Sequence, residues 1–263
     1  MHGFLLSQLF KRQRMHKADI LGVKVDIIDA AGLHNAIAES IARGERDVYA
    51  YVNINAINIA YENERFKRIL NSAHCVYCDG EGVRLGAAML GYHLPPRVVL
   101  TYWIWDLCAF CQDQDYSLFF LGATDEYVRE AVQRVRERFP KLRIVGFHHG
   151  YFPKRGAESD AVVELIDRAQ PDILIVGFGM PMQEFWIEEN FKRLNARVIL
   201  PAGSMIDYTA GRKGLAPKWM ADHGMEWLYR FFQEPGRLWK RYLIGNPTFV
   251  LRVLFERVKK GSV

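Results

Sequence analysis

The sequence lacks long apolar runs, although half of its 263 residues are hydrophobic. No run approaches the roughly 18 to 20 apolar residues that a membrane-spanning helix requires. The first residues, MHGFLLSQLFKRQR, hold an apolar patch that is too short and wrongly flanked for a secretory signal. We therefore expect a cytoplasmic, globular chain that buries a substantial core as one large α/β domain, alone or with an appendage.

Cysteine is scarce, and its four copies form two CxxC pairs. Cys75 and Cys78 lie inside a predicted buried strand, where alternate residues face opposite sides and the turn that zinc pairs use is missing. Cys108 and Cys111 fall in an apolar, predicted helical segment. Zinc and disulfides remain alternatives, but the pattern favours ordinary buried thiols and predicts no metal site.

Three common catalytic motifs are also missing. There is no GxSxG elbow and no Walker P-loop, which counts against a serine hydrolase and a standard NTPase. No GxGxxG follows a predicted strand, so a dinucleotide oxidoreductase has weak support.

Apolar runs alternate with helical stretches about six times, which is typical of an α/β fold. We predict a Rossmann-like, mainly parallel sheet with helices on both faces. A small antiparallel hairpin is expected over 18–29, around Gly22, followed by a helix over 30–43. The expected strands are 48–52, 75–78, 117–121, 143–147, 172–176 and 197–200, with a helix over 81–90 and another ending near 139.

After Gly203 the pattern changes to helices only, punctuated by prolines. A short helix is expected over 224–233, and Pro235 suits the first turn of a longer one. The predicted organisation is an N-terminal segment (1–17), an α/β domain (18–210), which the family resemblance described below implies to be the nucleotide-sugar-binding catalytic domain, and a basic, aromatic helical appendage (211–263).

Polar and glycine residues follow the predicted strands. Asn53, Asp79, Gly122, Gly177 and Gly203 all fall at carboxyl ends, where open α/β sheets bind ligands, so one crevice is expected to gather them. Residues 92–100 are expected to form a mobile loop near this crevice.

The stretch 171–186, PDILIVGFGMPMQEFW, is the most informative in the chain. A buried strand ends at two glycines and reopens as a helix, with Pro181 in its first turn. Gln183 and Glu184 would then lie beside free backbone donors at a positive helix end, where phosphate or sugar hydroxyls can bind. An ordinary strand-to-helix turn is the alternative. The full set of residues expected to bind the ligand of this crevice is Asn53, Asn55, Gly122, Thr124, Gly177, Gly179, Pro181, Glu184 and Gly203.

Asp79 is the best candidate for a general base, because it ends a strand and would face the crevice. Aspartate is also a preferred cap for the helix that starts after Gly80, and the pattern does not separate the two roles.

The C-terminal segment carries the surplus of positive charge. From residue 212 onward eleven basic residues stand against four acidic ones, interleaved with Trp, Tyr and Phe. This composition is typical of an amphipathic interfacial surface, and anionic lipid headgroups are its expected partner. No nucleic-acid recognition signature accompanies it, so we expect no nucleic acid. The alternative is a helical hairpin that packs on its own domain.

These residues together resemble the bacterial WecG/TagA/CpsF glycosyltransferases. The motifs are VNINAINIA, CDGEGVRLGAAMLG, LFFLGATDE, VGFGMPMQEFW and the long segment that holds EWLYR and EPGR, and the resemblance spans residues 18–242. It implies an inverting transfer of a hexose or N-acetylhexosamine from a UDP-sugar to a polyprenyl diphosphate-linked saccharide, in cell-surface or exopolysaccharide synthesis. It also implies a peripheral location on the inner face of the cell membrane.

The resemblance implies roles for individual residues. Asp79 matches the family's proposed base, and Gln183 matches the glutamine of its donor site. Arg230, Arg237 and Arg241 fall in the family's C-terminal basic segment, thought to close over the active site at the membrane and to contact acceptor and diphosphate. Tyr51 stands where many members carry threonine, which leaves the donor sugar open. No cofactor and no divalent metal are implied, since the UDP-sugar is a substrate and no DxD follows a strand.

Two rival functions stay open at this point. One is a Rossmann-type enzyme that modifies nucleotide sugars, which would bind a nicotinamide. The other is an inactive protein that binds lipid surfaces, supported only by Tyr51. A homo-oligomer is possible, because members of the family can associate through the core.

Overall fold

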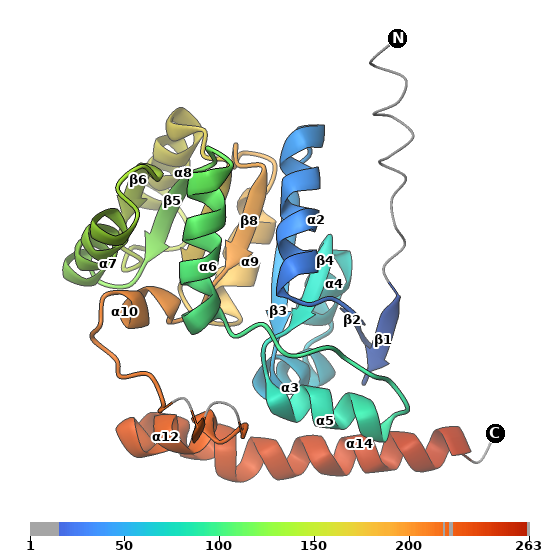
Figure 1. Ribbon diagram of the computed structural model, residues 1–263. Coiled ribbons are helices and arrows are strands. Elements are labelled where there is room, and N and C mark those ends of the chain that lie inside the picture. Colours follow the sequence, from blue (N-terminus) through green and yellow to red (C-terminus); the bar gives the residue numbers. More distant parts are fainter. Residues whose placement is uncertain (1–15, 218, 221–222, 262–263) are drawn as a thin grey trace.

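A computed structural model describes residues 16–217, 219–220 and 223–261. Its centre is a six-stranded, wholly parallel sheet with the order β4-β3-β8-β7-β5-β6 (Figure 1). The strands are β3 (Asp47–Val52), β4 (Cys75–Cys78), β5 (Ser117–Gly122), β6 (Arg143–His148), β7 (Ile173–Gly177) and β8 (Val198–Pro201). The expected α/β class is confirmed. The expected segment 1–17 lies outside the described residues, apart from its last two.

Helices cover both faces of the sheet, as expected (Figure 1). In β5, Leu118 and Phe120 pack into one layer, while Phe119 and Leu121 pack into the other, because successive side chains of a strand point to opposite faces. One layer holds α2 (Ala30–Arg43), α6 (Leu100–Asp113), α7 (Asp125–Arg138) and α10 (Met205–Thr209); the other holds α3 (Ile54–Glu62), α4 (Glu64–Ser72), α8 (Ala157–Ala169) and α9 (Met182–Asn190).

The N-terminal hairpin, β1 (Lys17–Ile20) and β2 (Val23–Asp26), is antiparallel as expected. It lies beside β4, at one edge of the main sheet (Figure 1). Asp26 Oδ2 accepts a 2.7 Å hydrogen bond from the backbone N–H of Val76 in β4 and pairs with Lys17 at 3.1 Å. The hairpin therefore satisfies a backbone donor that the edge strand would otherwise expose.

Two predicted boundaries near the glycine turn shift slightly. β7 begins at Ile173 rather than at Asp172, because the Asp172 carboxylate accepts hydrogen bonds from the N–H and hydroxyl of Ser117, each at 2.7 Å. Pro181 occupies the position just before α9 and not its first turn. All four cysteines are buried and free of disulfides. Within the described residues no group of His, Cys, Asp and Glu is arranged to hold a metal ion.

The C-terminal segment is helical and runs along one edge of the molecule (Figure 1). It consists of α12 (Glu226–Gln233), α13 (Pro235–Trp239), the π-helix η1 (Lys240–Gly245) and α14 (Asn246–Gly261). Phe249 and Val253 are buried against α5 (Glu81–Met89), so closely that a Cβ on Gly86 would lie 2.5 Å from the Phe249 ring. Asn58 of α3 donates a 2.8 Å hydrogen bond to the carbonyl of Gly245. The segment thus does pack on its own domain.

The opposite side of this segment is apolar and exposed. Its exposed large apolar side chains are Trp227, Phe232, Trp239, Leu243, Ile244, Val250, Leu251, Leu254, Phe255 and Val258, which we call the apolar outer face. The part of the chain that the structure describes contains no helix with the length and hydropathy needed to cross a bilayer.

Candidate active site

A cavity of about 1020 Å³ lies at the carboxyl ends of the central strands, between the sheet and the C-terminal segment. This places it where parallel α/β sheets bind ligands. Predicted residues from the strand ends and from the C-terminal segment meet in it. Those that line the cavity are Asn53, Asn55, Asp79, Gly177, Gly179, Gly203, Arg230, Arg237 and Arg241.

Asp79 leaves the end of β4 and points between α3 and α6. Its Oδ1 accepts a 3.2 Å hydrogen bond from the N–H of Leu100, and its Oδ2 lies 3.5 Å from Asn53 Nδ2. No side chain caps the start of α5 at Gly80, so the alternative of Asp79 as the cap of that helix is wrong. Asp79 instead satisfies the first N–H of α6, and its carboxyl stays at the cavity.

Burial raises the pKa of Asp79 above the ordinary aspartate value; Arg230 opposes this effect, and Glu226 adds to it. A carboxylate with a raised pKa holds a proton more readily, as a general base must. Asn53 lies beside it and also caps α3, since its Oδ1 accepts a 3.2 Å hydrogen bond from Ala56 N–H. At Gly80 a Cβ would come within 2.9 Å of the Cβ of Asn53, so glycine permits the two turns to meet.

Gln183 lies beneath the cavity and is fully buried. Its Oε1 accepts hydrogen bonds from Gly179 N–H at 3.1 Å and Gly203 N–H at 2.9 Å, and its Nε2 donates to Glu184 Oε1 at 2.8 Å. The sequence placed Gln183 and Glu184 among free backbone donors beside a ligand. The structure differs, because here the glutamine itself takes up the donors of the two glycine turns.

Glu184 is also buried, and its Oε2 has no hydrogen-bond partner among the described residues. Burial raises its pKa to about 7. It borders a second, smaller cavity between α4 and α9 and not the main one.

The remaining residues predicted to bind the donor either cap a helix or allow close contact between strand ends. Thr124 caps α7, accepting a 3.2 Å hydrogen bond from Tyr127 N–H. A Cβ on Gly122 would lie 2.5 Å from the carbonyl of Gly177, and one on Gly177 would lie 2.8 Å from the carbonyl of Gly203. These three glycines therefore form a tight row across adjacent strand ends, the glycine row. Gly122, Thr124 and Pro181 support the cavity without lining it.

The three predicted arginines reach the cavity from the C-terminal segment. Arg230 of α12 pairs with Glu226 at 2.5 Å, and its guanidinium lies 5.0 Å from the ring centre of Tyr208. Arg237 pairs with Glu234, and Arg241 lies over the ring of Tyr242. Two lysines that the sequence analysis did not single out, Lys154 and Lys213, add further positive charge to the lining.

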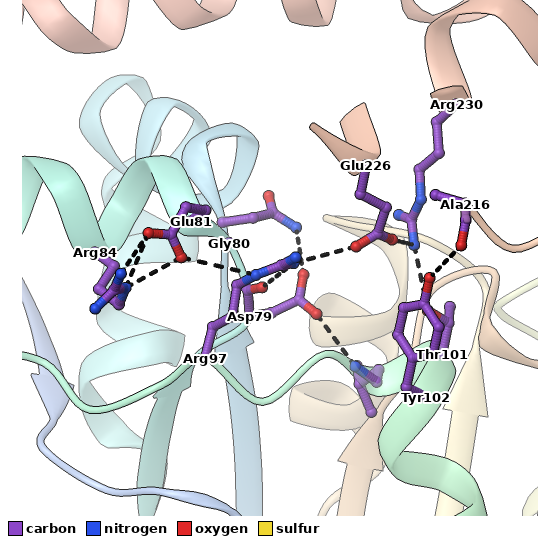
Figure 2. Close-up of polar contacts among 12 residues, drawn as sticks. Asp79, Gly80, Glu81, Arg84, Arg97, Thr101, Tyr102, Ala216, Glu226 and Arg230 are labelled. Carbon is purple, nitrogen blue, oxygen red and sulfur yellow. Dashed lines mark hydrogen bonds and ion pairs between the residues drawn. The ribbon is translucent and has the colours of Figure 1, made fainter. Parts of the chain in front are cut away.

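Arg97 and Glu226 were also missed. Arg97 belongs to the loop expected near the crevice and donates a 3.4 Å hydrogen bond to the carbonyl of Asp79. Glu226 opens the EWLYR motif and binds Arg97 and Arg230 together (Figure 2). The proline pair before Arg97 marked the loop, but no local signal marks this contact.

Comparison with known proteins agrees with this geometry. The family model described as "Glycosyl transferase WecG/TagA/CpsF family" matches residues 18–262. A relative from Staphylococcus aureus strain MW2, named N-acetylglucosaminyldiphosphoundecaprenol N-acetyl-beta-D-mannosaminyltransferase, is 28% identical over 258 residues, covering 96% of this chain and 98% of the relative. The relative of the same name from strain MRSA252 is 27% identical over the same shares. The chain belongs to the WecG/TagA/CpsF family and is a glycosyltransferase.

Proposed function

We propose that the protein is an inverting glycosyltransferase that moves a hexose or N-acetylhexosamine from a UDP-sugar to a polyprenyl diphosphate-linked saccharide, in cell-surface or exopolysaccharide synthesis. The observation that carries this proposal is the meeting of the Asp79 carboxyl with Arg230, Arg237 and Arg241 in a single cavity. The name of the relatives indicates that they act on a diphosphoundecaprenol-linked sugar, which supports the acceptor class.

The Asp79 carboxylate and the arginines of the cavity suit the two halves of the reaction. Asp79 takes the proton of the acceptor hydroxyl as that oxygen attacks the anomeric carbon of the donor. The bond from this carbon to the diphosphate breaks in the same step, so the configuration inverts and UDP leaves. The arginines neutralise the negative charge that develops on the leaving diphosphate. No divalent cation is required in this proposal.

The donor would lie over the glycine turns, where missing side chains let the backbone approach a ligand. Tyr51 sits at their base, and its hydroxyl lies 2.7 Å from where a Cβ on Gly203 would be. Burial raises the pKa of this tyrosine, which lines the cavity together with Asp79 and Gly203. We infer that Tyr51 contacts the transferred sugar.

A peripheral position on the inner face of the cell membrane is part of the proposal. The apolar outer face presents tryptophans, phenylalanines and leucines from the same segment that supplies the arginines. Lys240, Arg257 and Lys259 are exposed in that segment, as expected of a helix that lies on an anionic bilayer. The acceptor would then enter the cavity from the lipid surface.

A panel of UDP-sugars tests the proposal. Purified protein is incubated with each donor and a short-chain lipid diphosphate-linked sugar, and the product is identified by mass and by the anomeric configuration in its NMR spectrum. We expect transfer from one donor, with inversion and in the presence of EDTA. A retained configuration, or turnover that requires added metal, would refute the mechanism. A bound nicotinamide would favour the rival nucleotide-sugar-modifying enzyme, and lipid binding without transfer would favour the inactive one.

A further inference from the structure

Glu226 is a buried carboxylate that joins two arginines from distant parts of the chain. It is 6% exposed. Its Oε2 lies 3.1 Å from Arg97 Nη1, and its Oε1 lies 2.5 Å from Arg230 Nη2 (Figure 2). A buried carboxylate is strongly disfavoured unless it is paired, and here both oxygens are paired.

Both arginines also face Asp79. Arg97 donates to the Asp79 carbonyl at 3.4 Å, and Arg230 exerts the strongest favourable charge effect on the Asp79 carboxylate. Arg230 Nη2 also donates a hydrogen bond to Thr101 Oγ1 at 3.4 Å, and the guanidinium lies over the ring of Tyr208. Glu226 is therefore the link that ties α12 to the loop before α6, beside the candidate base (Figure 2).

We infer that Glu226 is a positioning residue, which holds Arg97 and Arg230 at the cavity and offsets their charge so that Asp79 remains a competent base. This inference rests on the proposed role of Asp79. Two unpaired arginines near an aspartate stabilise its ionised form and weaken it as a base. A carboxylate that binds both of them removes most of that effect while leaving them in place for the diphosphate.

Three other titratable side chains near Asp79 are uncharged near neutral pH. Tyr51 of β3 and Tyr77 of β4 have pKa values raised by burial, and burial raises the pKa of Cys78 to about 12. The charged groups that act most directly on Asp79 are Arg97 from the loop and Glu226 and Arg230 from α12, and Glu81 of α5 lies 3.8 Å from Arg97 Nε. Removing the Glu226 charge thus leaves Arg230 without the Glu226 carboxylate and Arg97 with only the longer contact to Glu81.

The direct test is an NMR titration of the Asp79 carboxyl carbon in the full-length protein without substrate, assigned through Asp79→Asn. In Glu226→Gln we expect the midpoint to fall by about one pH unit or more, as for a carboxylate beside an uncompensated cation. A second substitution, Arg97→Gln, should return it part of the way. An unchanged midpoint in Glu226→Gln would overturn the inference.

Glu189→Gln is a matched control. Glu189 also bridges two arginines, Arg65 at 3.0 Å and Arg155 at 2.6 Å, but it lies on α9 away from the cavity. Its loss should leave the Asp79 midpoint unchanged. If Glu226→Gln does not fold, Glu226→Asp, one methylene shorter, should reach only one arginine and lower the midpoint by a smaller amount; an unchanged midpoint there would equally refute the inference.

Kinetics separate this inference from the proposed function. If the wild type transfers sugar, kcat of Glu226→Gln should fall about tenfold at neutral pH, while KM for the donor stays within about twofold. The acid limb of the pH–rate profile of this variant should move to lower pH. Equal kcat and an unmoved limb would sink the inference alone. Absence of transfer by the wild type would sink the proposed function, and the NMR midpoint would still report on the charge offset.

Discussion

The Oε1 atom of Gln183 accepts a hydrogen bond of 2.9 Å from the backbone N–H of Gly203. The same atom accepts a second one, of 3.1 Å, from Gly179. A single buried amide therefore joins the turn after β7 to the turn after β8. The spacing of these turns sets the floor of the cavity on which a donor would lie.

Gln183→Ala should loosen this floor. Two backbone donors lose their acceptor, and each unsatisfied buried group costs about 1–3 kcal/mol. We expect the free energy of unfolding in urea to fall by about 2–3 kcal/mol and the KM for the donor to rise. Gln133→Ala, which removes an exposed bond to Glu137 on α7, serves as the control and should change neither. If Gln183→Ala has the same KM for the donor as the wild type, Gln183 does not shape the donor site.

Asp79→Asn should abolish most transfer without unfolding the protein. The amide keeps an oxygen to accept the Leu100 N–H but cannot take a proton, and loss of a general base lowers kcat by about 10² to 10⁴. The variant should still bind UDP, as measured by isothermal titration calorimetry. Asp160→Asn, at an exposed pair with Arg193, is the control. Near wild-type kcat in Asp79→Asn would refute the assignment of the base.

Glu184 should make the protein less stable as the pH rises. Its pKa is raised by burial to about 7 from the model-compound value of 4.5, so the folded state binds more protons than the unfolded state between these values. Stability contributed by this group is fully present below pH 4.5 and is lost as the pH rises through 7. Between about pH 5 and pH 8 the loss is about 2–3 kcal/mol.

Glu184→Gln should remove this dependence, because the amide does not titrate and still accepts the hydrogen bond from Gln183 Nε2. Urea unfolding of both proteins at the two pH values measures it. Glu158→Gln on the exposed side of α8 is the control. Parallel pH dependence in the wild type and Glu184→Gln would show that Glu184 is ionised in the folded protein across the range.

Membrane binding should depend on the apolar outer face. Replacing Leu251 and Phe255 together by glutamine removes two strongly exposed apolar groups from α14 without touching the buried Phe249 and Val253. We expect weaker sedimentation with phosphatidylglycerol vesicles and unchanged transfer to a short-chain, water-soluble acceptor. Leu165→Gln, an exposed leucine on α8, is the control. Unaltered vesicle binding by the double variant would contradict the membrane role of this face.

The helices and strands could largely be predicted because their signals are local. α2 begins and ends where expected: Asp29 accepts from Gly32 N–H at its start, and Gly44 adopts a left-handed conformation at its end. The strand order β4-β3-β8-β7-β5-β6 was not predicted, since it depends on how distant segments pair. The shifted start of β7 also depends on a distant segment, because Asp172 accepts a hydrogen bond from the N–H of Ser117, 55 residues away.

The candidate site was predicted where topology alone collects residues. Asn53, Asp79, Gly177 and Gly203 share a cavity because parallel strands bring their carboxyl ends to one edge. The orientation of a side chain within the site was not predictable from pattern: Gln183 turns down toward two N–H groups that only the folded chain places together. The Arg97–Glu226 pair spans 129 residues and leaves no trace in either local sequence.

The glycine row has a consequence for how this enzyme can diverge. An added methyl group on Gly122 or Gly177 would collide with the carbonyl of the next glycine in the row, and one on Gly203 would collide with the Tyr51 hydroxyl, so substitution cannot reshape the floor that this row supports. New donor preferences must then arise from the residues around that floor, such as Tyr51, Asn55 and Met182. Evolution of sugar selectivity would act on these residues and leave the glycine row unchanged.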